Sequence, residues 1–224
     1  MIYIIFIVFA LVSFAVQQAL KSKFRNYSQI PLPNNLTGRE VAEKMLRECG
    51  VYDVTVKSVE GELTDHYNPL TRTVNLSSGV YGSNSIAAAA VAAHECGHAV
   101  QHAVKYPFLQ LRSSLVPVIS FASQWVQWIL LAGILMLQTF PQLMLIGIVL
   151  FAATTLFSFI TLPVEVNASS RALAWLSSSG ICNVNTYPKA KDALTWAAYT
   201  YVVAALSSLA TLVYYILIFT SRRD

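Results

Sequence analysis

His94-Glu95-Cys96-Gly97-His98 is the stretch that most constrains the fold and chemistry of this chain, because it follows the pattern H-E-x-x-H. It lies in a run from Ile86 to Val104 that is rich in alanine and other small or helix-favouring residues. Polar residues at 83–85 are suitable N-caps, so we expect a helix here. Residues four apart share one face of a helix. His94 and His98 are therefore expected to turn two imidazoles toward a single metal ion.

Glu95 would lie beside that ion. Two neutral imidazoles suit Zn²⁺, and the adjacent carboxylate can take a proton from a water that the zinc activates. This pattern indicates one catalytic zinc ion at a metallopeptidase site, with Glu95 as general base. Two buried core histidines would also fit the spacing, but they would leave a costly charge in an apolar helix unexplained. Cys96 is expected only to fill space, because the helix turns it away from both histidines.

A catalytic zinc site needs a third protein ligand. His102 extends the histidine stripe, but eight residues of helix rise about 12 Å, too far for one ion to bind both His94 and His102. We interpret His102 as a supporting residue or as helix surface. Glu165 is the better candidate, because it follows a long stretch without other charges. Pro163 suits the first turn of a short helix over 163–172, where the helix dipole would also favour a carboxylate. Two histidines and Glu165 would leave a fourth position open for water.

Three segments of the chain carry a resemblance to a known family. Residues 91–102, which contain H-E-C-G-H, are similar to the signature of the bacterial membrane-bound neutral zinc metallopeptidases of the YugP type. Residues 163–172 resemble that family's second motif, and residues 66–77 resemble its approach to the zinc helix. Where Asn167 stands, the resemblance leads us to expect an acidic residue; an asparagine can still accept a hydrogen bond but brings no charge. The resemblance covers most of the chain and implies a catalytic Glu95 with the zinc ligands His94, His98 and Glu165.

The composition indicates a membrane protein. The chain has 224 residues, of which 55% are hydrophobic and 12% charged, whereas soluble domains usually carry about twice that charged fraction. Charges are absent from residues 1–20, 113–164 and 193–221. The predicted fold class is a mainly α membrane protein with four transmembrane helices and a small α+β zincin-like domain that contains a short sheet. Since about 20 apolar residues span a bilayer, we expect the transmembrane helices near residues 2–20, 115–138, 142–162 and 197–219.

These segments suggest how the chain is organised. The first lacks a basic start and precedes several cations, which favours an uncleaved signal-anchor over a signal peptide. A hairpin of the second and third would bring the H-E-x-x-H helix and Glu165 to one membrane face, close to the bilayer surface. We divide the chain into an anchor helix (1–20), an α+β region (21–112), a transmembrane hairpin (113–164), a segment with the third ligand (165–195), and a last helix with its tail (196–224).

The distribution of cations predicts which side this face is on. Cations near membrane ends lie mostly on the side of the H-E-x-x-H helix. The positive-inside rule then predicts a multi-pass protein of the bacterial cell membrane with a cytoplasmic active site, although Arg222 and Arg223 favour the opposite orientation. The cations that support the cytoplasmic assignment are Lys21, Lys23, Arg25, Arg112, Arg171, Lys189 and Lys191.

The α+β region has its own local signals. The capping-box pattern of residues 37–40 predicts a helix that ends at Gly50. Residues 54–59 alternate as a strand, Leu63-Thr64 could begin a return strand, and residues 71–76 predict a further strand. A short sheet beside the zinc helix could bind an extended peptide at its exposed edge, or it could be a plain core hairpin. The sequence leaves both interpretations open.

Several residues have more than one interpretation. Asp65 and His66 could be a transition-state donor and the group that orients it, or an ordinary turn. Arg171 could stabilise an oxyanion, bind lipid headgroups or cap Glu165.

The net charge of +4 is explained by cations that attract anionic lipid, so we expect no nucleic-acid partner. The three cysteines have no C-x-x-C spacing and require no disulfide.

We therefore expect a membrane-anchored zinc metalloendopeptidase that cleaves peptides or membrane-protein loops near the bilayer. Two alternatives stay open. A site-2-type intramembrane protease would share H-E-x-G-H, but it takes a ligand from an Asp-Gly pair, which this chain lacks. A non-catalytic zinc-stabilised scaffold or chaperone would need a fourth ligand, and only His66 or His102 could supply it. The sequence identifies neither the substrate nor any regulatory membrane partner.

Overall fold

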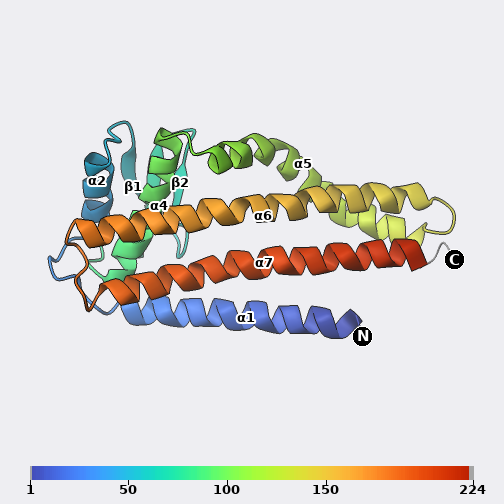
Figure 1. The fold of residues 1–224 in the computed structure, drawn as a ribbon, viewed down its shortest axis with the longest axis horizontal. Coiled ribbons are helices and arrows are strands. Elements are labelled where there is room, and N and C mark those ends of the chain that lie inside the picture. Colours follow the sequence, from blue (N-terminus) through green and yellow to red (C-terminus); the bar gives the residue numbers. More distant parts are fainter. Residues whose placement is uncertain (1, 222–224) are drawn as a thin grey trace. The chain divides into compact units, whose positions relative to one another are not determined.

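The computed structural model describes residues 2–221, which fold into two compact units (Figure 1). The α/β unit comprises Val16–Leu109 and Pro163–Tyr199, and the helical unit comprises Met1–Ala15, Gln110–Leu162 and Thr200–Asp224. The elements along the chain are α1 (Ile2–Tyr27), α2 (Gly38–Glu48), β1 (Thr55–Val59), β2 (His66–Asn68), β3 (Thr73–Ser77), α3 (Ser78–Tyr81), α4 (Ile86–Ala103), α5 (Pro107–Leu135), α6 (Pro141–Ser178) and α7 (Tyr187–Ser221).

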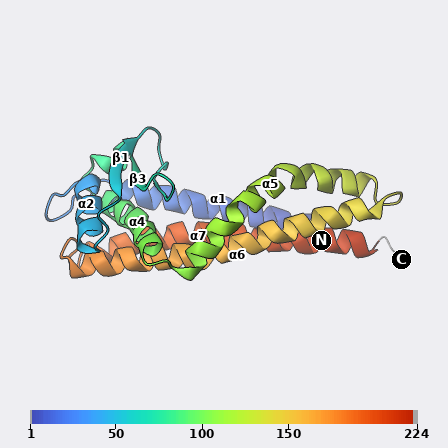
Figure 2. The ribbon, with the colours of Figure 1, turned by 90° about the horizontal axis from the view of Figure 1, so that it is seen from above.

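The α/β unit contains a three-stranded sheet in the order β1-β3-β2. β1 pairs with β3 in parallel, and β2 pairs with β3 in antiparallel orientation. The central strand β3 is buried along its whole length, which its two neighbours and the adjoining helices explain. The strands lie beside α2 and α4 (Figure 2).

The predicted return strand at Leu63-Thr64 is wrong. Gly61 and Leu63 both have positive φ, at 101° and 56°, a conformation that breaks an extended strand. Thr64 Oγ1 donates to Glu60 O and closes the turn instead. β2 follows this turn, and β1 pairs with β3 instead of with a return strand. The sheet is therefore mixed and is not a simple hairpin.

Two helices form the core of the α/β unit with the sheet. α2 begins with the predicted capping box, in which Thr37 and Glu40 exchange hydrogen bonds, and the chain leaves it through Gly50 at φ 74°. α4 begins at the N-cap Ser85, whose side chain accepts from Ala88 N. The predicted helix over 86–104 agrees with α4 to within one residue. Because most of α4 is buried, its alanines allow close packing on every side.

The ends of α1 and α7 that belong to the α/β unit are joined by polar contacts. Asp192 accepts a hydrogen bond from Tyr27 OH at 2.6 Å and forms an ion pair with Lys23 Nζ at 2.8 Å. These contacts join the polar end of α1 to the polar start of α7.

In the helical unit, α5 and α6 pack as an antiparallel hairpin around a short loop. A Cβ on Gly133 would lie 2.7 Å from Met144 Cα, and one on Gly147 would lie 2.8 Å from Leu130 Cδ2. These glycines let the two helices approach closely, as small residues do between apolar helices. A buried apolar cluster fills the contact: Val126, Leu130, Leu137, Met144 and Ile148.

The prediction of a separate short helix that begins at Pro163 is wrong. α6 runs from Pro141 to Ser178 with Pro163 inside it. Proline lacks an N–H and usually ends a helix in water, but apolar surroundings favour continued helix because open backbone groups would be costly there. Glu165 therefore lies within a helix, and the argument from a helix-start dipole does not apply to it.

Four helices are long and apolar enough to cross a membrane: the Phe6–Tyr27 part of α1, and all of α5, α6 and α7. The predicted fold class, mainly α with four apolar spans and a short sheet, is confirmed. α1, α6 and α7 extend beyond the predicted spans through additional turns, whereas α5 begins earlier than predicted, at Pro107, and ends at Leu135, before the predicted residue 138. Arg222 and Arg223, which bear on the predicted sidedness, lie outside the described residues.

Candidate metal centre

Two helices of the α/β unit supply the candidate ligand atoms. His94 and His98 lie on α4, and Glu165 lies on α6. Glu165 Oε2 is 3.3 Å from His94 Nε2 and 3.5 Å from His98 Nε2. The three ligand atoms all lie within 4.8 Å of one another. The structure thus gathers the three residues that the sequence singled out, and their role as ligands stays a prediction.

The chemistry of this cluster fits a zinc ion. Ligand atoms about 2.0–2.2 Å from a tetrahedral zinc lie roughly 3.4 Å apart, close to both separations just given. Glu165 Oε2 is buried without a hydrogen-bond partner, which is costly for a carboxylate oxygen unless a cation meets it. Two histidines and a glutamate are a ligand set of catalytic zinc sites, and they leave a fourth position for water.

The electrostatics of the cluster also favour a cation. Burial lowers the pKa of His98, but the carboxylates of Glu165 and Glu95 raise it, and the net shift is upward. A proton and a metal ion therefore compete for the His98 imidazole. The Glu165 carboxylate lies among the imidazoles of His94 and His98, and a divalent cation held there would be attracted to its negative charge.

Gly97 allows α6 to approach α4 beside the candidate ligands. A Cβ at position 97 would lie 2.6 Å from Ala168 O, closer than side-chain atoms come to a backbone oxygen. Ala168 is itself fully buried. Glycine is therefore required by the contact between the two helices, and the motif alone does not reveal this role.

His98 is held by a buried amide that the sequence analysis missed. Gln101 is 0% exposed. Its Nε2 donates to Val164 O at 2.8 Å and to Asn167 Oδ1 at 3.0 Å. Both donors of the amide are then engaged, so Oε1 faces His98 Nδ1, 3.0 Å away. An amide oxygen accepts, so His98 Nδ1 carries the proton and Nε2 keeps its lone pair for a metal.

His94 is held differently. Ser169 Oγ lies 3.0 Å from His94 Nδ1, so a hydroxyl supports this histidine where an amide supports the other. Asn167 Oδ1 accepts from Gln101 Nε2, the amide that holds His98, and a supporting role for Asn167 stays a prediction. Arg171 Nε donates to Asn167 Oδ1 at 2.8 Å, which places this side chain on the supporting network rather than among the ligand atoms.

Glu95 lies beside the cluster but is not part of it. It is 9% exposed, and its Oε2 accepts a hydrogen bond from the backbone N–H of Tyr67 on β2 at 2.9 Å. The sequence analysis did not predict Tyr67, because a backbone donor from another element leaves no signal in residue spacing.

The remaining histidines have other partners. His66 is exposed, and its ring lies 2.8 Å from Thr64 O through Nδ1 and 3.1 Å from Asn75 Nδ2 through Nε2. Asp65 accepts from the backbone N–H and hydroxyl of Ser77. This pair therefore ties the sheet together. His102 Nδ1 lies 2.7 Å from Tyr67 OH, outside the ligand cluster, and its supporting role stays a prediction.

The cysteines of the described chain are free. Cys96 Sγ donates to Ala42 O at 3.5 Å and is fully buried between α2 and α4. Burial raises the pKa of this thiol well above its usual value, so it stays a neutral thiol. The structure agrees with the interpretation of Cys96 as a space-filling residue.

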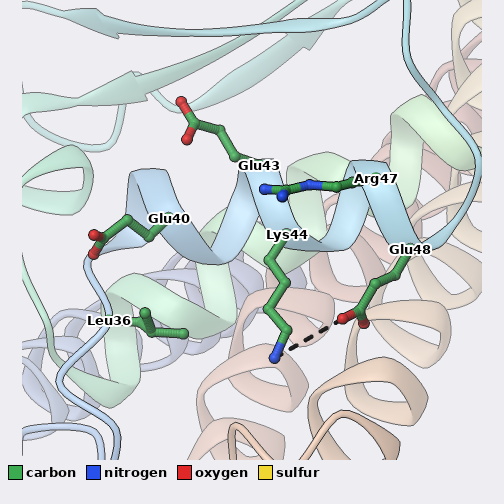
Figure 3. A pocket seen from close by; sticks show the side chains of 6 residues that line it. All are labelled: Leu36, Glu40, Glu43, Lys44, Arg47 and Glu48. Atoms are coloured by element: carbon green, nitrogen blue, oxygen red, sulfur yellow. Dashed lines mark ion pairs between the residues drawn. The ribbon is translucent and has the colours of Figure 1, made fainter.

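A hollow of about 320 Å³ lies along α2 (Figure 3), and none of its lining residues belongs to the ligand cluster. Most of its charged groups have partners: Lys44 and Glu48 form an ion pair at 3.9 Å, Glu43 pairs with Arg39 at 2.7 Å, and Glu40 belongs to the capping box. Glu48 also accepts from Trp175 Nε1 at 2.8 Å. These contacts stabilise α2, and we assign no ligand to this hollow. Its lining residues are Leu36, Glu40, Glu43, Lys44, Arg47 and Glu48.

An H-E-x-x-H helix with a glutamate from a second helix is the ligand arrangement of a class of zinc metallopeptidases. The chain belongs to the family described as "Putative neutral zinc metallopeptidase", whose profile matches residues 2–220. It is 44% identical over 225 residues to the "Putative membrane protease YugP" of Bacillus subtilis (strain 168), and the match covers 100% of this chain and 99% of that relative. No solved structure matches the chain. The expected family resemblance is confirmed, and with it zinc as the metal that this family and cluster imply.

Proposed function

We propose that this protein is a membrane-anchored zinc endopeptidase that cleaves peptide bonds near a membrane surface. The observation that carries the proposal is the buried, unpartnered Oε2 of Glu165, which faces two histidine Nε2 atoms on the H-E-x-x-H helix. Membership in a family of zinc peptidases and the likeness to a membrane protease support the same activity.

Three residues would bind the metal, and a fourth would transfer the proton during hydrolysis. His94, His98 and Glu165 would hold the zinc, which when bound polarises a water molecule and the peptide carbonyl. Glu95 takes a proton from the water as its oxygen attacks the carbonyl carbon. The same carboxylic acid then gives the proton to the leaving amine as the C–N bond breaks. Because Tyr67 N–H holds Oε2 of Glu95, Oε1 is the oxygen that receives and returns this proton.

The substrate is proposed to be a peptide or an extended loop of a membrane protein. β2 pairs with β3 on one side only, and the Tyr67 N–H points from its other side to Glu95. In a strand, the N–H and C=O of one residue face the same side. The Tyr67 carbonyl is thus placed to accept an N–H from an extended chain that lies along this edge.

The proposed location is an integral membrane protein with the active site on the cytoplasmic face. The four apolar helices support membrane insertion. The cations of the chain segments that adjoin the predicted spans support the cytoplasmic orientation through the positive-inside rule.

Catalysis is favoured here over a zinc-stabilised scaffold. A closed structural site needs a fourth protein ligand. The two histidines outside the H-E-x-x-H pair are His66 and His102, and both have other hydrogen-bond partners. The donor set therefore supports an open position for water.

The test is zinc content and peptide cleavage by the full-length protein in detergent. We expect Glu95→Gln to retain zinc and lose cleavage by about 10²- to 10⁴-fold, the range of general acid–base catalysis. We expect Glu165→Ala to lose the metal. Glu62, which is exposed, provides matched controls: Glu62→Gln and Glu62→Ala should change neither quantity.

Two results would contradict the proposal. If Glu165→Ala bound zinc as tightly as the unaltered protein, Glu165 would not be a ligand. If the zinc-loaded protein cleaved a broad peptide library no faster than Glu95→Gln, the scaffold function would be favoured.

A further inference from the structure

We propose that Tyr67 and His102 form a positioning pair that holds the Glu95 carboxylate in its reactive orientation. The inference rests on the proposed function for the role of Glu95. It also assigns a role to His102, the third histidine of the stripe on α4, which the metal cluster does not include.

Tyr67 contacts α4 at two points. Its backbone N–H donates to Glu95 Oε2 at 2.9 Å, and its phenol oxygen lies 2.7 Å from His102 Nδ1. The Tyr67 and His102 rings are 5.9 Å apart with planes inclined by 56°. All three side chains are at least partly buried, so water competes weakly for these hydrogen bonds.

The two contacts fix the strand relative to the helix. Glu95 and His102 are seven residues apart on α4, which is about two turns or roughly 10.5 Å. β2 has only three residues, His66–Asn68, and pairs only with β3. Such a short strand offers few ladder hydrogen bonds to hold its register. The Tyr67–His102 bond supplies a second attachment and so determines where the Tyr67 N–H lies over Glu95.

This attachment matters for a general base. A glutamate side chain has several rotatable bonds, and its carboxylate must present one oxygen to the water in a narrow range of geometry. With Oε2 held by the strand, rotation is restricted and Oε1 is left for the proton. Tyr67 and His102 are therefore positioning residues, since neither touches the reacting atoms.

The test compares variants that break or keep the bond. Tyr67→Phe and His102→Leu remove it, whereas His102→Asn keeps a polar atom near the Nδ1 position. We expect both bond-breaking variants to lower kcat about tenfold with zinc content unchanged, and to raise KM less than that, because the same strand edge is proposed to bind the substrate. The double variant should be no slower than either single variant, and His102→Asn should recover most of the rate. Tyr52→Phe is the matched control, because Tyr52 is 81% exposed.

Hydrogen exchange at the residue-67 amide provides a readout that needs no substrate. We expect exchange to be about tenfold faster in Tyr67→Phe and His102→Leu, because the N–H leaves Glu95 when the strand loosens. Exchange should be unchanged in Tyr52→Phe. Unchanged exchange in both bond-breaking variants would overturn the inference. So would a loss of zinc that parallels the loss of rate, because the pair would then support α4 as a whole.

Failure of the proposed function gives a different result. If the zinc-loaded protein cleaves no peptide, the endopeptidase proposal fails, and the exchange measurement alone decides whether Tyr67 and His102 hold Glu95.

Discussion

The α/β unit and the helical unit are both closely packed, but they bury different groups. The α/β unit buries Gln101, Glu165 and Glu95 among apolar residues; both polar atoms of the Gln101 amide and Oε2 of Glu95 have specific hydrogen-bond partners. In the helical unit, the contact of α5 with α6 is apolar. Of its buried threonines, Thr161 bonds back to Phe157 O of its own helix, and Thr155 shares a single hydroxyl bond with Ser208. A polar network has one satisfied arrangement, whereas an apolar contact tolerates exchange of similar volumes. Changes in the polar network around His94 and His98 should therefore alter metal binding, and changes in the α5–α6 contact should alter stability alone.

The largest expected effect comes from one added methyl group in each unit. Gly97→Ala places a Cβ against Ala168 O, so α6 must move away from α4. We expect a loss of about 1–3 kcal/mol in stability and the greatest loss of zinc affinity among these variants, because ligand geometry tolerates only about 0.5 Å. Thermal unfolding and zinc competition with a chelator measure the two effects.

The matched change in the helical unit is Gly133→Ala, whose Cβ would meet Met144. It should destabilise the protein similarly but leave zinc affinity unchanged. Gly79→Ala, in open space, should change neither. If Gly133→Ala weakened zinc binding as much as Gly97→Ala, the two units would not differ as described.

Gln101→Leu should have the next largest effect on the metal. The substitution leaves His98 Nδ1, Val164 O and Asn167 Oδ1 without the amide that joins them. Loss of a group that orients a ligand histidine commonly costs about 10- to 100-fold in metal affinity. Chelator competition checks this value, and Gln110→Leu, at an exposed position, serves as the control. If Gln101→Leu bound zinc as tightly as the unaltered protein, Gln101 would have no role in supporting the metal ligands.

Ser169→Ala should have a smaller effect than Gln101→Leu. It removes one neutral hydrogen bond, to the partly exposed His94, and such bonds contribute about 0.5–1.5 kcal/mol. We therefore expect zinc affinity to fall by about two- to tenfold. Ser177→Ala, at an exposed position of the same helix, is the control. A loss greater than that of Gln101→Leu would reverse the order of support that we assign to the two histidines.

Thr37→Ala should have the smallest effect on the metal. It removes the capping box of α2, which should lower stability by about 1 kcal/mol without changing zinc affinity. Thr37→Ser keeps the cap and should restore stability. A change in zinc affinity here would mean that α2 transmits strain to α4.

Features that depend on neighbouring residues were predictable from the sequence. The spacing of His94 and His98 on one helix follows from 3.6 residues per turn, and the capping box at Thr37 follows from a four-residue pattern. The four apolar spans follow from length and hydropathy. Glu165 was found by its isolation as a charge, although the helix assumed around it was wrong.

Features that depend on distant segments were not predictable. The parallel pairing of β1 with β3 skips β2, and local alternation of residues cannot show this. Ser169 lies 75 residues from the histidine that it contacts, and Gln101 lies 63 residues from Val164. A buried glutamine or serine is chemically ordinary, so nothing in its residue type marks it as part of a site.

The sequence by itself determined the periodic and compositional features of this protein: the helix that carries His94, Glu95 and His98, the apolar spans, and the donor types suited to zinc. Only the tertiary structure decided that Gly97 brings Ala168 against α4, that an amide holds one histidine and a hydroxyl the other, and that Tyr67 holds Glu95. The reason is physical. Helix periodicity and apolar length are set by bonds between near neighbours, whereas the orientation of each buried polar group is set by whichever distant partner satisfies its hydrogen bonds.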